Sequence, residues 1–160
     1  MRRLLRAEIR AVESLRSDCL SFDMHPIQLG LGASPWRVAV CSMLLCRSRY
    51  QQVLPVVQEL FRRWPTAAAL ARADDGELES AIRSLGLYRN RRRQLQRFSS
   101  LYTGDSWAEL MDLPGVGVYV ADAVGIVCFG DTALESGDTA LKAYAAHLVG
   151  ASVLSRTIRG

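Results

Sequence analysis

The chain has 160 residues, of which 49% are hydrophobic, and a formal net charge of +4 at neutral pH. This length is typical of one domain, residues 1–160, that buries about two thirds of its unfolded surface on folding. No run reaches the roughly 18 apolar residues that span a bilayer, and the charged N-terminus lacks the pattern of a signal peptide, so we expect an intracellular protein with no membrane partner.

The spacing of apolar residues predicts an all-α fold, because helical periodicity recurs along the whole chain and alternating β-branched stretches are few. Ser34 and Pro35 mark one helix start, as an N-cap followed by a proline at the first helical position. Residues 21–33 are rich in glycine and have no periodicity, which predicts a loop lying over a cleft. The expected helices span residues 2–17, 35–46, 50–63, 66–72, 75–84, 90–101, 106–111, 118–129 and 139–149.

Arginine supplies all but one of the 20 basic side chains, and Lys142 is the exception. Guanidinium groups bind phosphates and base edges with two-pronged geometry, although a GC-rich genome produces the same bias without any function. The run at residues 89–93 is more specific. It follows a helix end and a turn, so Arg89, Asn90 and Arg91 should cluster at a helix N-terminus where positive charge opposes the helix dipole. We therefore predict that this run contacts phosphate.

Residues 111–129 carry the pattern of a helical hairpin. Gly115 and Gly117 permit a tight turn between two helices, and they leave the amides before Val118 without side-chain cover. Such amides at the positive end of a helix can hold a phosphate. The alternative is an ordinary corner between two helices, because Gly-x-Gly alone is a weak signal. Val116 can point back between the two helices as a packing wedge.

The hairpin leads into an apolar helix, and a short loop then places Asp138 at the start of another helix. Aspartate is a common N-cap, so capping is the simplest explanation for Asp138. Capping does not prevent catalysis, because a carboxylate at this helix start faces the same cleft as the phosphate-binding end of the hairpin.

Several segments together resemble the helix-hairpin-helix DNA glycosylase superfamily, and within it the glycosylase domain of the methyl-CpG-binding-domain thymine glycosylase. The resemblance covers residues 20–150 and implies two helical lobes around a DNA-binding cleft. It also implies a double-stranded DNA partner carrying a mismatched or damaged base. The matching stretches are Pro35-Trp36, residues 45–48, Gly86-Leu87-Tyr88, residues 113–119 and the pattern Asp138-x-x-Leu141-x-x-Tyr144.

The resemblance assigns Asp138 as the catalytic carboxylate, which stabilises positive charge on the deoxyribose and orients the attacking water. Tyr119 occupies the position of the lysine that forms a Schiff base in the endonuclease III branch, and tyrosine cannot do this. Lys142, the only lysine, lies four residues after Asp138, where a phosphate contact or a salt bridge is its expected task. These features predict a monofunctional enzyme that leaves an abasic site.

The resemblance also assigns residues to the flipped base and to the duplex. Gln28 lies eight residues before Trp36, and its carboxamide offers a donor and an acceptor to the Watson–Crick edge of thymine or uracil. The alternative for Gln28 is a loop glutamine in solvent. Tyr119 could stack on or hydrogen-bond the same base. Arg47 matches the residue that fills the gap left in the duplex, and Arg89 or Asn90 falls where a wedge enters the opposite strand.

The chain departs from many superfamily members in its cysteines. Its four cysteines include no Cys-x-x-Cys pair and show no ligand-like spacing with the two histidines, so we expect free thiols, no metal, no iron-sulfur cluster and no other cofactor.

Three functions stay open from the sequence: removal of thymine, uracil or a 5-substituted uracil opposite guanine, removal of another modified pyrimidine, and DNA binding without catalysis. We favour the first. We expect the protein to act as a monomer in the compartment that holds the DNA, and its product to be processed by an abasic-site endonuclease.

Overall fold

The structure is a computed structural model, and it describes residues 3–15, 20–21 and 26–157, with the side chains of residues 152–157 left aside. Cys19, His25 and the last two positions of the helix expected at residues 2–17 lie outside the described residues. The described part is helical, as the sequence predicted, and contains one isolated antiparallel bridge between Leu5 and Glu109. Its α-helices are α1 (Arg6–Ser14), α2 (Pro35–Leu45), α3 (Tyr50–Arg63), α4 (Ala67–Ala71), α5 (Asp75–Ile82), α6 (Tyr88–Thr103), α7 (Val118–Phe129) and α8 (Thr139–Thr157).

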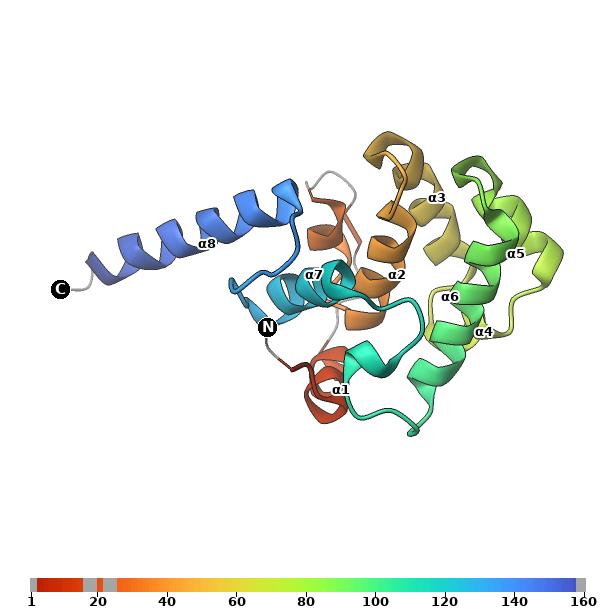
Figure 1. Ribbon diagram of the computed structural model, residues 1–160, viewed down its shortest axis with the longest axis horizontal. Helices are drawn as coiled ribbons and strands as arrows, with labels where there is room; N and C mark the ends of the chain where they lie inside the picture. Colours follow the sequence, from red (N-terminus) through yellow and green to blue (C-terminus); the bar gives the residue numbers. More distant parts are fainter. Residues whose placement is uncertain (1–2, 16–19, 22–25, 158–160) are drawn as a thin grey trace.

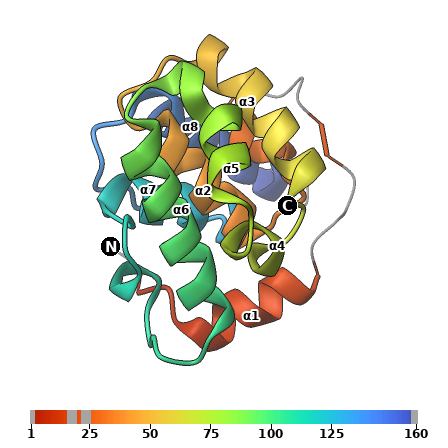
Figure 2. The same ribbon diagram turned by 90° about the vertical axis from the view of Figure 1, so that its right-hand side faces the viewer.

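Helix α2 is the central element. Every residue from Pro35 to Leu44 is buried, and the helix packs on α7 and contacts α1, α3 and α6. Its start follows the predicted rule, because the Ser34 hydroxyl accepts a hydrogen bond from the Arg37 amide at 3.2 Å. Helices α3 to α6 lie on one side of α2, and α1, α7 and α8 lie on the other (Figure 1). Seen from the first side, α4, α5 and α6 stand in front of α2 and α7 (Figure 2).

The apolar segment after the hairpin forms α7, which is buried from Val120 to Ile126 as expected for a helix inside a bundle. Gly130 ends it in the left-handed conformation, with φ of 66°. Helix α8 then begins at Thr139 and extends to Thr157, beyond the predicted end at residue 149. Its C-terminal part points away from the other helices (Figure 1).

The helix predicted at residues 106–111 is wrong. Only the short 3-10 turn η3 (Leu110–Asp112) forms there. Tertiary pairing replaces the helical hydrogen bonds, because the Arg6 amide donates to the Ala108 carbonyl at 2.8 Å and the Leu110 amide donates to the Leu4 carbonyl at 2.9 Å. A second 3-10 turn, η1 (Ile27–Gly30), forms inside the segment predicted as a loop, and a third, η2 (Arg83–Leu85), follows α5.

Candidate active site

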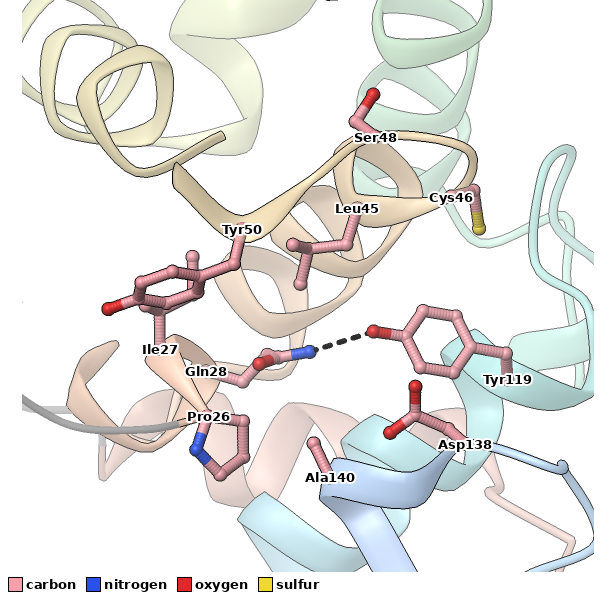
Figure 3. A pocket seen from close by; sticks show the side chains of 10 residues that line it. All are labelled: Pro26, Ile27, Gln28, Leu45, Cys46, Ser48, Tyr50, Tyr119, Asp138 and Ala140. Atoms are coloured by element: carbon pink, nitrogen blue, oxygen red, sulfur yellow. Dashed lines mark hydrogen bonds between the residues drawn. The ribbon is translucent and has the colours of Figure 1, made fainter. Parts of the chain in front are cut away.

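Five segments meet around a pocket of about 330 Å³ (Figure 3). They are η1, the C-terminal end of α2 with the loop that follows it, and the first turns of α3, α7 and α8. The pocket therefore lies where the two sides of the molecule meet, with α3 contributing from one side and α7 and α8 from the other. Its lining residues are Pro26, Ile27, Gln28, Leu45, Cys46, Ser48, Tyr50, Tyr119, Asp138 and Ala140.

Asp138 lies at the start of α8, as the sequence predicted, and it both caps the helix and lines the pocket. Its Oδ1 accepts a hydrogen bond from the Leu141 amide at 2.8 Å, and its carbonyl accepts one from the Lys142 amide at 3.1 Å. The carboxylate lies beside the ring of Tyr119 at the pocket wall (Figure 3). The side chain is thus held in a fixed position at the positive end of α8, facing the pocket.

Tyr119 and Gln28 are joined across the pocket. Gln28 Nε2 donates to the Tyr119 hydroxyl at 3.1 Å and to Ser42 Oγ at 3.4 Å. Burial raises the pKa of Tyr119 well above its usual value, and the nearby charge of Asp138 raises it further. Tyr119 therefore keeps its proton. Because its oxygen already accepts from Gln28, its hydrogen is directed to another acceptor.

Gln28 is not a solvent-exposed loop residue, because only 1% of it is exposed. Within the described part of the chain its Oε1 is buried and accepts no hydrogen bond. A buried acceptor without a donor costs about 1–3 kcal/mol. A donor that reached this oxygen would recover that cost.

The hairpin turn matches the prediction at Gly115 and differs from it at Gly117. Gly115 has φ of 83°, in the left-handed region, and an added Cβ would lie 2.3 Å from Nε2 of Gln94 on α6. Gly117 is extended, with φ of −101° and ψ of −175°. Val116 is buried, in accordance with its predicted role as a wedge. Gly117 and Val118 are exposed at the positive end of α7, where the first amides of a helix lack partners within it.

Arg91 is the clear error among the predicted DNA contacts. It is 8% exposed and turned inward, with its guanidinium donating to the carbonyls at the end of α2. Burial lowers the pKa of Arg91, although a guanidinium stays charged. Arg91 therefore holds the loop after α2 in place instead of binding a phosphate. Its acceptors are the carbonyls of Met43, Leu44, Cys46 and Gly86 and the hydroxyl of Ser48.

The other members of the arginine run differ from Arg91. Arg92 pairs with Asp75 at 3.0 Å and Glu79 at 3.2 Å on α5, so it too is engaged within the protein. Arg89 and Asn90 are exposed at the start of α6, and the Arg89 guanidinium lies 5.8 Å from the ring centroid of Tyr88. The periodicity of a helix divides the run, because consecutive residues point about 100° apart.

A second hollow of about 270 Å³ shares Cys46 with the pocket. Two of its lining residues, Arg47 and Leu87, are exposed and left-handed, with φ of 62° and 48°. This conformation is costly for residues other than glycine, and such strain concentrates at functional sites. The hollow is lined by Met43, Cys46, Arg47, Leu87, Asn90, Arg91, Gln94 and Gly115.

Sequence reasoning missed Leu87 and Tyr50 as site residues. Leu87 is 63% exposed and precedes the first residue of α6. Its one sequence signal was an apolar residue between Gly86 and the polar start of a helix, a place where side chains are normally polar. Tyr50 begins α3 and reaches the pocket only through the fold. Lys142 is exposed on α8 and, among the described residues, is not one of those that line the pocket.

A family model described as "HhH-GPD superfamily base excision DNA repair protein" matches residues 40–151. The chain belongs to this superfamily. The matched range contains the hairpin and Asp138, and Gln28 lies outside it. The family match thus includes the hairpin and Asp138, whereas the proposed role of Gln28 depends on the geometry of the pocket.

Two curated relatives and one solved structure illustrate the likeness. The chain is 38% identical over 97 residues to "Methyl-CpG-binding domain protein 4-like protein" of Arabidopsis thaliana, covering 61% of this chain and 22% of the relative. It is 35% identical over 105 residues to "Thymine-DNA glycosylase" of Aeropyrum pernix, covering 61% of this chain and 47% of the relative. The chain therefore spans less than half the length of these two relatives. A non-covalent endonuclease III–DNA complex superposes with a TM-score of 0.59 and 26% identity, covering 88% of this chain and 64% of that chain.

Two features are absent from the described residues, a membrane-spanning helix and a metal-binding cluster. No helix in this part of the chain is long and apolar enough to cross a membrane. Among the same residues, no three or more His, Cys, Asp and Glu side chains are grouped so that they could hold a metal ion.

Proposed function

We propose that the protein is a monofunctional DNA glycosylase that hydrolyses the N-glycosidic bond of thymine or uracil mispaired with guanine. The observation that carries this proposal is the convergence of Gln28, Tyr119 and Asp138 on one pocket from three segments far apart in the chain. Superfamily membership supports the reaction class, and the likeness to the thymine-DNA glycosylase of Aeropyrum pernix supports the base.

Asp138 carries the chemistry in this proposal. As the bond between C1′ and N1 of the base breaks, its electron pair leaves with the base and positive charge develops on the sugar. The Asp138 carboxylate stabilises that charge and takes a proton from the attacking water, whose oxygen bonds to C1′. The base anion takes up a proton at N1 as Asp138 releases the one it received, so the net products are a free base and an abasic site, which is the substrate of an abasic-site endonuclease.

We propose that no Schiff base forms because the chain has a single lysine, which lies outside the pocket lining. Lys142 is the only lysine of the 160 residues, and it is exposed on α8. Tyr119 occupies the place on α7 that a lysine holds in the endonuclease III branch, and a hydroxyl cannot form an imine. Water is therefore the proposed nucleophile.

Gln28 and Tyr119 select the base. The free Oε1 of Gln28 accepts, and the Tyr119 hydroxyl donates, so together they match the N3–H group and a neighbouring carbonyl of thymine or uracil. Cytosine presents an unprotonated N3 to the same oxygen, so two acceptors would face each other. This pairing disfavours cytosine without any steric contact.

The exposed groups at the hairpin, at the start of α6 and on α8 would hold the duplex, and those at the second hollow would open it. The amides of Gly115, Gly117 and Val118 would bind a phosphate at the hairpin, and Arg89, Asn90 and Lys142 would contact the backbone. Arg47 would fill the gap that the flipped nucleotide leaves. Leu87 is better suited than Arg89 or Asn90 to act as the apolar wedge, because it is an exposed apolar side chain that lines the same hollow as Arg47. A mispaired base is cheaper to extrude by a few kcal/mol, which favours mismatches over A·T pairs.

The test is an alkali-cleavage assay on duplexes that carry U·G, T·G, 5-hydroxymethyluracil·G or A opposite 8-oxoguanine. We expect cleavage of the thymine- and uracil-type substrates only, and no covalent adduct after borohydride treatment. Cleavage limited to the 5-hydroxymethyluracil duplex would indicate a pocket that is specific for a modified pyrimidine instead of thymine or uracil. Binding without any base release would overturn the enzymatic proposal, and a borohydride-trapped adduct would overturn the hydrolytic mechanism.

A further inference from the structure

Asp122 is a buried carboxylate that the proposed mechanism does not use. It lies on α7, three residues after Tyr119, and it is 4% exposed. A single oxygen, Oδ2, accepts hydrogen bonds from the amides of Glu135 at 2.9 Å and Ser136 at 2.6 Å. Burying a carboxylate is expensive unless its charge is compensated, and two short N–H donors provide that compensation.

The two amides belong to the loop that delivers Asp138. Residues 130–138 connect α7 to α8 without regular secondary structure, and Ser136 lies two residues before Asp138. The loop makes further hydrogen bonds to itself and to the end of α7. The Ala133 amide donates to Asp131 Oδ1 at 3.0 Å, and the Asp131 amide donates to the Gly125 carbonyl at 3.1 Å.

The contact with Asp122 therefore joins the end of this loop to the same helix that carries Tyr119. Tyr119 and Asp122 are about one helical turn apart, so the rigid backbone of α7 fixes their positions relative to each other. Without the two bonds, the residues just before Asp138 would lose the restraint that joins them to α7. The separation of the Tyr119 hydroxyl and the Asp138 carboxylate would then depend on a loop.

We propose that Asp122 is a positioning residue, which fixes the Asp138 carboxylate against the sugar by holding the Glu135 and Ser136 amides. This inference rests on the proposed function, since it assigns Asp122 a task in that reaction. What Asp122 supplies is an acceptor of fixed position, so an amide oxygen at the same place should serve almost as well as a carboxylate.

The experiment compares Asp122→Ala with Asp122→Asn under single-turnover conditions at saturating T·G duplex, with Kd and thermal stability measured on the same preparations. We expect Asp122→Ala to slow excision about 30- to 100-fold, because a displacement of about 1 Å has effects of this size. Its Kd should stay within about threefold of wild type, because the phosphate contacts lie elsewhere. Asp122→Asn, which keeps the acceptor, should recover the rate to within about threefold.

The matched control is Asp131→Ala, which removes a carboxylate–amide bond from the same loop on the side away from Asp138. We expect its excision rate to stay within about twofold of wild type. A folded Asp122→Ala protein that excises at the wild-type rate would overturn the inference. So would an Asp122→Asn protein as slow as Asp122→Ala, because the acceptor alone would then not account for the effect.

Hydrogen exchange on the wild-type protein provides a test that does not depend on folding of the alanine variant. The Glu135 and Ser136 amides should exchange far more slowly than that of Thr132 in the same loop, and equal exchange would overturn the proposed restraint. A wild-type protein that releases no base would overturn the proposed function and this inference with it. An active wild type with an equally active Asp122→Ala variant would overturn this inference alone.

Discussion

The two hollows that share Cys46 are built in opposite ways. The pocket that holds Asp138 is organised by hydrogen-bonded polar side chains, with Gln28 tied to Tyr119 and Asp138 tied to the start of α8. The neighbouring hollow presents exposed residues in a strained conformation, with Arg47 and Leu87 both left-handed. Under the proposed function, the first region is preorganised for chemistry and the second serves to distort the bound duplex. Substitutions in the first should change the rate of bond cleavage, and those in the second should change how readily a duplex is opened.

The largest expected effect is that of Asp138→Asn. Asparagine is as good an N-cap as aspartate, so the free energy of unfolding should change by less than about 0.5 kcal/mol. The carboxylate charge is lost, and single-turnover excision of thymine from T·G duplex should fall about 10²- to 10³-fold with little change in Kd. Retention of most of the wild-type rate would contradict the assignment of Asp138 as the catalytic group.

Arg91→Met tests the boundary between the two regions. Loss of the guanidinium would leave the carbonyls at the end of α2 without this donor, so the free energy of unfolding measured by urea denaturation should fall by about 3 kcal/mol. The matched control is Arg89→Met in the same run, where stability should change by less than about 0.5 kcal/mol and DNA affinity should fall. Equal stability of the two variants would show that Arg91 is not a structural residue.

Gln28→Leu probes base selection inside the pocket. The substitution keeps the volume and removes the acceptor, so excision of thymine from T·G should fall about 10- to 100-fold. Stability should change by less than about 1 kcal/mol, because removing an unpaired buried oxygen offsets the loss of two hydrogen bonds. Gln58→Leu, at an exposed position on α3, serves as the control. A Gln28→Leu protein with wild-type excision would remove Gln28 from the proposed site.

Leu87→Ala should have the smallest effect, and only on duplex substrates. Excision from T·G duplex should fall about 10-fold, because the wedge that offsets base extrusion is lost. Excision of uracil from single-stranded DNA should be unchanged, and stability should stay within about 0.5 kcal/mol because the side chain is 63% exposed. Equal losses on single- and double-stranded substrates would place Leu87 in the chemical step and remove the distinction between the two hollows.

Local patterns predicted most of the helices because their signals lie within a few residues of one another. The starts of α2 and α8 followed from Ser34 and Asp138, and the apolar stretch after the hairpin predicted α7 with its observed bounds. The helix expected at residues 106–111 was wrong because pairing with residues 4–6 supplies hydrogen bonds that no local pattern encodes. The arginine run was misjudged at Arg91 for a related reason: the carbonyls that Arg91 satisfies belong to α2, more than 40 positions earlier in the chain.

The sequence alone determined the helical class, the glycine turn, the helix start at Asp138 and the presence of a single lysine. These are properties of composition and of neighbouring residues, which act through backbone conformation and local capping. The tertiary structure decided that Gln28 is buried with an unpaired oxygen beside Tyr119, that Leu87 and Arg47 share a hollow, and that Asp122 grips the loop before Asp138. Only packing brings segments about 90 residues apart, such as Gln28 and Tyr119, within hydrogen-bond distance, and no local pattern carries that information.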